Sequence, residues 1–143
     1  MKKALYFFFT ILFINLSLAQ KKQDFSVNSP DGKIEVKITV NDKISWSISH
    51  EKDLILAPSE MSLTLDENQV LGKNPIVLNS KKGSVNSSFE TPLYKKKSVK
   101  DQYNKLTINF KNDFGIEFRV FDDGAAYRFL IKKKKRLQLN QKK

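Results

Sequence analysis

The chain has 143 residues, a formal net charge of +11 and no cysteine. Its length suits one domain with one core, and the lack of cysteine excludes disulfides, thiolate metal sites and cysteine nucleophiles. Nine of the positive charges lie at the two ends, two within residues 1–3 and seven within residues 132–143. The part between them is nearly neutral, so the charge does not favour a nucleic-acid-binding domain.

The N-terminus predicts a secretory signal peptide over residues 1–19. Two lysines precede the apolar run from Ala4 to Ile14, and the small residues Ser17 and Ala19 stand where signal peptidase inspects the chain. The apolar run is shorter than the roughly 20 residues that a membrane span requires. We therefore expect an exported protein that keeps no membrane anchor and begins, after cleavage, at Gln20.

Alternating apolar residues predict antiparallel strands along most of the remaining chain. Apolar side chains occupy every second position from Ile34 to Val40 and again from Ile44 to Ile48, which gives each run one buried face. Asn41-Asp42 supplies turn chemistry between the two runs and predicts a hairpin. Upstream, the residues Ser29-Pro30-Asp31-Gly32 predict a turn that closes a shorter strand around Phe25 and Val27.

The middle of the chain gives weaker signals. Leu54–Leu56 and Met61–Leu65 predict two short strands that are separated by Pro58 and closed by the turn residues 66–68. Between Gly72 and Ser98 we expect loops and short strands at a sheet edge, with residues 76–78 and 85–89 as the candidates.

The last third predicts a three-stranded meander. Its strands are the runs 106–110, 116–120 and 125–131, and its turns are Asn112-Asp113 and Asp122-Asp123-Gly124. About nine short strands without a helical period predict an all-β fold, an antiparallel β-sandwich over residues 20–131. Residues 132–143 are expected to form a disordered basic tail.

The composition offers little for catalysis or metal binding. His50 is the only histidine, so neither a catalytic triad nor a histidine-rich metal site can be built, and we expect it to be solvated at a strand end. Asp122 and Asp123 favour a turn over an acid/base pair, because neighbouring side chains at a strand end point apart. Trp46 shares a strand face with apolar neighbours and is expected in the core. We predict no catalytic and no metal-binding residue.

Two tyrosines are weak candidates for carbohydrate binding. Tyr94 and Tyr103 lie in polar company, Tyr94 beside Lys95–Lys97, and an exposed aromatic ring can stack on a sugar ring. The basic run Lys132–Arg136 could instead bind phosphates, but no aromatic residue interleaves its charges. A solvated tail is favoured, and no nucleic-acid partner is expected.

Three segments resemble the N-terminal domain of glycoside hydrolase family 97, which comprises bacterial α-glucosidases and α-galactosidases. They are SPDGKIEVKI at residues 29–38, DQYNKLTINF at residues 101–110 and FRVFDDGAAYRF at residues 118–129. The last segment is the most specific, because it joins a strand, an Asp-Asp-Gly turn and a second strand. The resemblance covers nearly all of Phe25 to Ile131, and we expect the sequence to depart from the family after Phe129.

The resemblance implies a super-sandwich that packs on a catalytic (β/α)₈ barrel followed by a β domain. It implies that the catalytic glutamates and the calcium-binding carboxylates of full-length enzymes come from parts that this chain lacks. We therefore expect an incomplete, truncated domain that has no cofactor and no activity of its own. Its partners would be the missing barrel and, through the full enzyme, an α-glucoside or α-galactoside, in the periplasm or at the surface of a Gram-negative bacterium.

Two other functions remain open from the sequence. The tyrosines and the sandwich plan are compatible with a free-standing carbohydrate-binding module of the periplasm or cell surface. The charges of residues 132–143 are compatible with a basic surface protein that acts through its tail.

Overall fold

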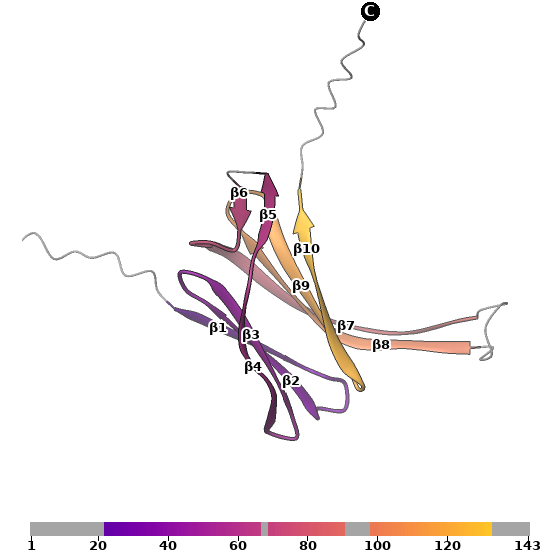
Figure 1. Cartoon of the computed structure of the whole chain (residues 1–143). Helices are drawn as coiled ribbons and strands as arrows, with labels where there is room; N and C mark the ends of the chain where they lie inside the picture. Colours follow the sequence, from indigo (N-terminus) through magenta and orange to yellow (C-terminus); the bar gives the residue numbers. More distant parts are fainter. Residues whose placement is uncertain (1–21, 67–68, 91–97, 133–143) are drawn as a thin grey trace, which may run out of the picture.

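The structure is a computed structural model that describes residues 22–66, 69–90 and 98–132 (Figure 1). The predicted signal peptide and nearly all of the predicted tail lie outside these residues. In the described ranges no helix is long and apolar enough to cross a membrane. The strands of the described residues are β1 (Gln23–Asn28), β2 (Ile34–Val40), β3 (Ile44–His50), β4 (Asp53–Met61), β5 (Leu63–Asp66), β6 (Gln69–Leu71), β7 (Val77–Glu90), β8 (Ser98–Phe110), β9 (Phe114–Phe121) and β10 (Gly124–Ile131).

The strands form two four-stranded sheets and a small third one. The first sheet has the order β1-β2-β3-β4, the second has the order β10-β9-β8-β7, and β5 pairs with β6. Every pairing is antiparallel. The two larger sheets face each other, with β1 against β8 and β2 against β9. This arrangement confirms the predicted all-β antiparallel sandwich.

The core lies between the two larger sheets and follows the period-two pattern of the sequence. Alternate residues of β2, β8 and β9 point inward, and residues on paired strands, such as Leu106 and Phe118, share this inner face. The fully buried side chains include Val36, Ile38, Val40, Ile44, Leu106, Ile108, Phe110, Ile116, Phe118 and Val120. Because the chain has no disulfides, burial of this apolar surface is the main contribution to the stability of its fold.

The turns predicted at residues 29–32, 41–42, 112–113 and 122–123 are confirmed, and backbone geometry explains their residues. The turn predicted at residues 66–68 includes residues 67–68, which lie outside the described residues. The Gly32 N–H donates to the Ser29 carbonyl over 3.0 Å, with Gly32 at a φ of 77° that favours glycine. Asn112 and Asp113 take positive φ values of 73° and 58° between β8 and β9, a conformation that asparagine and aspartate tolerate. Asp122 and Asp123 form the two-residue connection between β9 and β10, as expected.

Two predictions for the middle of the chain are wrong. Pro58 does not separate two strands, because β4 runs through it from Asp53 to Met61. This is possible because β4 is an edge strand whose register with β3 shifts nearby, and such positions tolerate proline.

The region predicted as loops and short strands is one long strand. β7 has 14 residues and pairs with β8 along its length, at the edge of the second sheet. The edge position was predicted, but the length was not. Part of the β7–β8 hairpin projects beyond the sandwich (Figure 1), so these residues need no apolar alternation to bury a face.

Candidate functional site

The structure tests only one of the two predicted carbohydrate-binding tyrosines. Tyr94 lies outside the described residues, so its role stays a prediction. Tyr103 is 6% exposed, and the expectation that its ring is exposed is therefore wrong. Pairing of β8 with β9 places Phe121 beside it, with ring centroids 5.0 Å apart, and the Arg119 guanidinium carbon lies 4.9 Å from the ring centroid. A ring covered in this way has no free face for a sugar.

The other singled-out residues lie where the sequence predicts them. His50 is exposed at the end of β3. Trp46 packs against the core, with its ring centroid 6.0 Å from that of Phe118 and 5.2 Å from that of Tyr127. Asp122 belongs to a turn, where its Oδ1 accepts a hydrogen bond of 2.9 Å from the Asp31 backbone N–H and links the two larger sheets.

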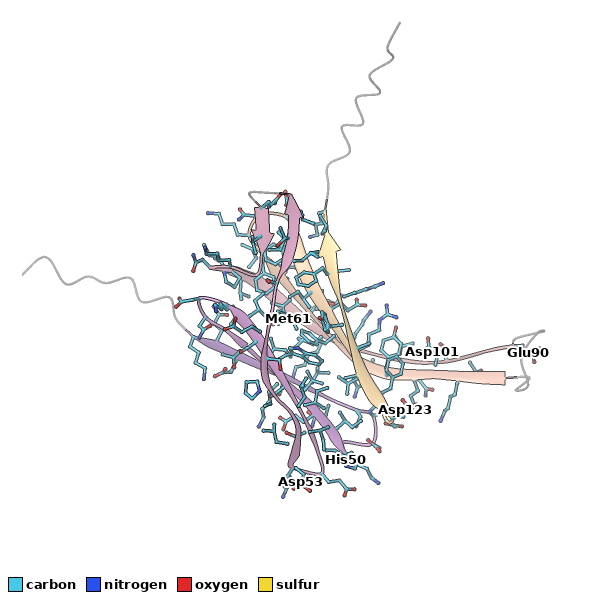
Figure 2. The ribbon with its side chains drawn as sticks, in the orientation of Figure 1. His50, Asp53, Met61, Glu90, Asp101 and Asp123 are labelled. Atoms are coloured by element: carbon cyan, nitrogen blue, oxygen red, sulfur yellow. The ribbon has the colours of Figure 1, made fainter. Side chains whose placement is uncertain are left out.

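The carboxylates labelled in Figure 2 do not converge on one point. Asp53, Glu90, Asp101 and Asp123 come from different parts of the molecule, from the end of the first sheet to the far end of the β7–β8 hairpin. Within the described residues, no group of three or more His, Cys, Asp or Glu side chains could hold a metal ion. These residues therefore do not fit the calcium site that the resemblance associates with full-length enzymes.

A charged and aromatic cluster covers the face of the second sheet that points away from the first. We call it the outer cluster: Tyr103, Glu117, Arg119, Phe121 and Arg128. The Arg119 Nε–H donates to Glu117 Oε1 over 2.9 Å, and Arg128 Nη2 lies 2.9 Å from the same oxygen. Glu117 is 7% exposed, so its charge is balanced inside a well-packed group rather than by water.

The electrostatics of the outer cluster hold Glu117 ionised. Burial alone would raise the pKa of the Glu117 carboxyl, but the hydrogen bond from Arg119 and the charges of Arg128, Arg119 and Lys105 outweigh it and keep that pKa below its ordinary value. The same contact with Glu117 raises the pKa of Arg119. A carboxylate held ionised in this way is unsuited to act as a general acid near neutral pH, and we assign it a structural role.

The sequence contained a signal for the outer cluster that we did not use. A two-residue turn at Asp122-Asp123 fixes the register of the β9–β10 hairpin, and that register places Arg128 opposite Glu117. Arg119 then lies on the same face, two residues from Glu117 along β9. Counting residues along both strands from the predicted turn at Asp122-Asp123 would therefore have predicted that Arg128 lies opposite Glu117.

Exposed apolar side chains also lie on two edge strands, β4 of the first sheet and β10 of the second. Leu54 and Ile55 on β4 are 59% and 67% exposed, and Tyr127 and Ile131 on β10 are 43% and 44% exposed. We call these four residues the open side. Of these four, Tyr127 also lines a hollow of about 170 Å³ together with Ala126, Glu117, Arg119 and Arg128. Large apolar side chains exposed on edge strands are candidates for contact with further protein.

Comparisons with known proteins agree with this architecture. The family model described as Glycosyl-hydrolase 97 N-terminal matches residues 27–143, so the match runs past Phe129, where we had expected the sequence to depart from the family. A retaining alpha-galactosidase of Bacteroides thetaiotaomicron is 38% identical over 133 residues, which are 93% of this chain and 20% of that protein.

Solved structures share the fold. A glycoside hydrolase family 97 enzyme of Pseudoalteromonas sp. strain K8, in complex with acarbose, superposes with a TM-score of 0.70 at 24% identity, over 79% of this chain and 18% of that one. A beta-arabinopyranosidase gives a TM-score of 0.71 at 23% identity, over 78% and 19%. The chain spans about a fifth of these relatives. The family match covers most of its residues, and the chain belongs to the glycosyl-hydrolase 97 N-terminal family.

Proposed function

We propose that the chain acts as the non-catalytic N-terminal β-sandwich domain of an exported family 97 glycoside hydrolase, where it packs on the catalytic part and helps to shape the carbohydrate site. One observation carries the proposal: a match to the N-terminal family over residues 27–143, combined with coverage of only 20% of the relative's length. The catalytic residues of such an enzyme would then lie in the remaining four-fifths of the full-length protein.

The described side chains support a packing role over a catalytic one. The buried carboxylate of Glu117 is bound by Arg119 and Arg128, whereas a glycosidase needs two carboxyl groups that flank one bond. The open side meanwhile exposes Leu54, Ile55, Tyr127 and Ile131 to solvent. A contact with the rest of an enzyme would bury them.

The relatives support an α-glycoside as the substrate class of the full enzyme. The relative of 38% identity is named a retaining alpha-galactosidase, and family 97 structures with the same fold hold acarbose and panose. In the proposed enzyme, this domain contributes to the shape of the site and leaves bond cleavage to the catalytic part.

A chimera tests the proposal with a complete enzyme. The segment of the Bacteroides enzyme that aligns with this chain is replaced by this chain's own residues, and the control enzyme has the same segment deleted. We expect the chimera to be soluble and to hydrolyse a nitrophenyl α-galactoside, while the deletion control and the isolated 143-residue chain do not. Turnover by the isolated chain, or a chimera as inactive as the deletion control, contradicts the proposed function.

Export is a separate part of the proposal. The arrangement Lys2-Lys3, apolar run and Ser17-Leu18-Ala19 supports a cleaved signal peptide. Expression in a Gram-negative host followed by mass spectrometry of the periplasmic fraction should find a mature chain that begins at Gln20. A chain that keeps residues 1–19 and stays in the cytoplasm contradicts this part alone.

A further inference from the structure

A hollow in the outer cluster has the side chains of a ligand site and takes no part in the sandwich core. It has a volume of about 170 Å³ and is lined by Glu117 and Arg119 of β9 and by Arg128 of β10. Pairing of β9 with β10 places Arg128 opposite Glu117 and Ala126 opposite Arg119. These four side chains share the outer face of the second sheet, and the short side chain of Ala126 leaves the space between the two arginines open.

Both arginines of the hollow are held in place before any ligand binds. The Arg119 Nε–H donates to Glu117 Oε1 over 2.9 Å, and Arg128 Nη2 lies 2.9 Å from the same oxygen. The Arg119 guanidinium carbon also lies 4.9 Å from the centroid of the Tyr103 ring, which packs against Phe121. A planar guanidinium that is already oriented loses little conformational freedom when it binds a ligand.

The hydrogen-bonding capacity of these side chains is only partly used. In the described part of the chain, the other guanidinium nitrogens of Arg119 and Arg128 have no hydrogen-bond or ion-pair partner. Glu117 Oε2 accepts no hydrogen bond there either, and since no buried side-chain oxygen of the described residues lacks a partner, Oε2 must reach the solvent. The hollow therefore offers N–H donors from two arginines and one acceptor oxygen from Glu117.

The charge of the hollow indicates what kind of ligand these groups suit. Two guanidiniums face one carboxylate, and Lys105 lies near enough for its positive charge to act on Glu117. An excess of positive charge favours an anion, and a guanidinium binds a planar carboxylate through two parallel hydrogen bonds. A neutral sugar would find no aromatic face to stack on, because Phe121 and Arg119 cover Tyr103. The donors thus suit a carboxylate, and the acceptor suits a hydroxyl beside it.

We propose that this hollow binds a sugar acid, a hexuronate whose carboxylate contacts Arg119 and Arg128 while a hydroxyl on the same ring donates to Glu117 Oε2. The inference rests on the proposed function only for the choice of a sugar, since the chain belongs to a family of carbohydrate-active proteins. In this role the domain contributes a carbohydrate contact of its own, and Glu117 both holds the arginines and contacts the ligand.

Nuclear magnetic resonance of the ¹⁵N-labelled 143-residue chain tests the site. Galacturonate at low salt should shift the side-chain Nε–H signal of Arg119 and the amide signal of Ala126, with a Kd on the order of 1 mM, since partly exposed charges bind weakly. Galactose carries a CH₂OH group in place of the carboxylate and should shift neither signal at the same concentration. Raising the salt concentration from about 20 mM to about 500 mM should weaken galacturonate binding several-fold, because salt screens exposed charges.

Two variants of exposed residues locate the binding in the hollow. Arg128→Gln removes one guanidinium and should raise the Kd for galacturonate by about tenfold. Ala126→Leu keeps every charge but fills the hollow, so it should abolish the shift of the Arg119 signal. Both positions are exposed, so neither variant disturbs the core. The matched control is Lys43→Gln, which removes one positive charge from an ion pair with Glu60 elsewhere on the chain and should bind galacturonate as the wild type does.

The outcomes separate this inference from the proposed function. Absence of a shift with galacturonate, or a shift that persists in both Arg128→Gln and Ala126→Leu, would overturn the site. Galactose that binds equally well would overturn the need for a carboxylate, and inorganic phosphate that binds as tightly as galacturonate would overturn the sugar acid as the ligand. An active chimera whose segment does not bind galacturonate contradicts this inference alone, whereas an inactive chimera beside a chain that binds galacturonate contradicts the proposed function alone.

Discussion

The centre of the sandwich and its open side are built from the same residue types but differ in how many neighbours each strand has. Ile38 of β2 and Phe118 of β9 have paired strands on both sides and the opposite sheet above them, and both are fully buried. Leu54 and Ile55 on β4 belong to an edge strand and are more than half exposed. Apolar character alone therefore does not determine burial, and the position of a strand in its sheet does.

This difference separates stability from recognition. The centre buries its apolar surface within the chain, so substitutions there should weaken the folded state whether or not a partner is present. Substitutions of Leu54 and Ile55 on the open side should have an effect only when further protein covers these residues. Variants in the two regions can therefore test whether the residues that stabilise the fold differ from the residues that contact a partner.

The largest effect is expected at Phe118. Phe118→Ala removes a fully buried ring that contacts Trp46 and Tyr127, so it should lower the free energy of unfolding by about 3–5 kcal/mol. Urea titration followed by circular dichroism measures the change, and fluorescence of Trp46 reports on the same core. A loss below about 1 kcal/mol would show that the centre is not a close-packed core.

A smaller loss is expected from the outer cluster. Glu117→Gln keeps the shape of the side chain but removes the charge that both arginines contact, and should cost about 1–2 kcal/mol, because the arginines are partly exposed and water screens them. Arg128→Gln is the companion variant and should cost less than about 1 kcal/mol, since Arg119 still pairs with Glu117. Urea titration measures both losses, and a larger loss from Arg128→Gln than from Glu117→Gln would contradict the central place of the carboxylate.

The pH dependence of stability gives an independent test of the same carboxylate. The pKa of Glu117 is lower in the folded chain than its ordinary value, so its contribution is complete above the unfolded pKa of about 4.3 and is lost as the pH falls through the folded value. As the pH falls below about 5, the free energy of unfolding of the wild-type chain should therefore decrease more than that of Glu117→Gln. If the free energies of unfolding of the wild type and of Glu117→Gln changed in parallel with pH, the stabilising role assigned to the Glu117 carboxylate would be contradicted.

The features that could be predicted from the sequence are those set by near neighbours in the chain. Period-two alternation identified β2, β3, β9 and the last five residues of β8, and the turn at 122–123 predicted β10. The turn residues at 29–32, 41–42 and 112–113 mark ends of these strands, but no local signal marked the start of β8 at Ser98. Both signals are local, because a strand alternates within itself and a hairpin turn depends on two to four residues.

The features that could not be predicted depend on strands that are distant in sequence. β7 shows no apolar alternation, since β8 supplies its pairing and part of it projects from the sandwich. Pro58 is compatible with β4 only because β4 lies at an edge. Tyr103 is buried by Phe121 and Arg119 from the neighbouring strand, so the polar residues beside it along the chain led to the wrong prediction.

The smallest change in the free energy of unfolding of the free chain is expected from substitutions of Leu54 and Ile55 on the open side. The same substitutions are informative because their effect should appear only in the chimera. Leu54→Ser combined with Ile55→Ser replaces two exposed side chains, so the free energy of unfolding should stay within about 0.5 kcal/mol of the wild-type value. In the chimera the same pair should lower the melting temperature by several degrees, because a contact between β4 and the rest of the enzyme would bury apolar surface there.

Val70→Ser on β6 serves as the control, because Val70 is also an exposed apolar residue but lies outside the open side. It should be neutral in both proteins. Equal losses from the two variants in the chimera would mean that the effect follows from the general removal of apolar surface. A loss confined to Leu54 and Ile55, and seen only in the chimera, would place a contact with the rest of the enzyme at β4, since in the free chain these two side chains are exposed to solvent.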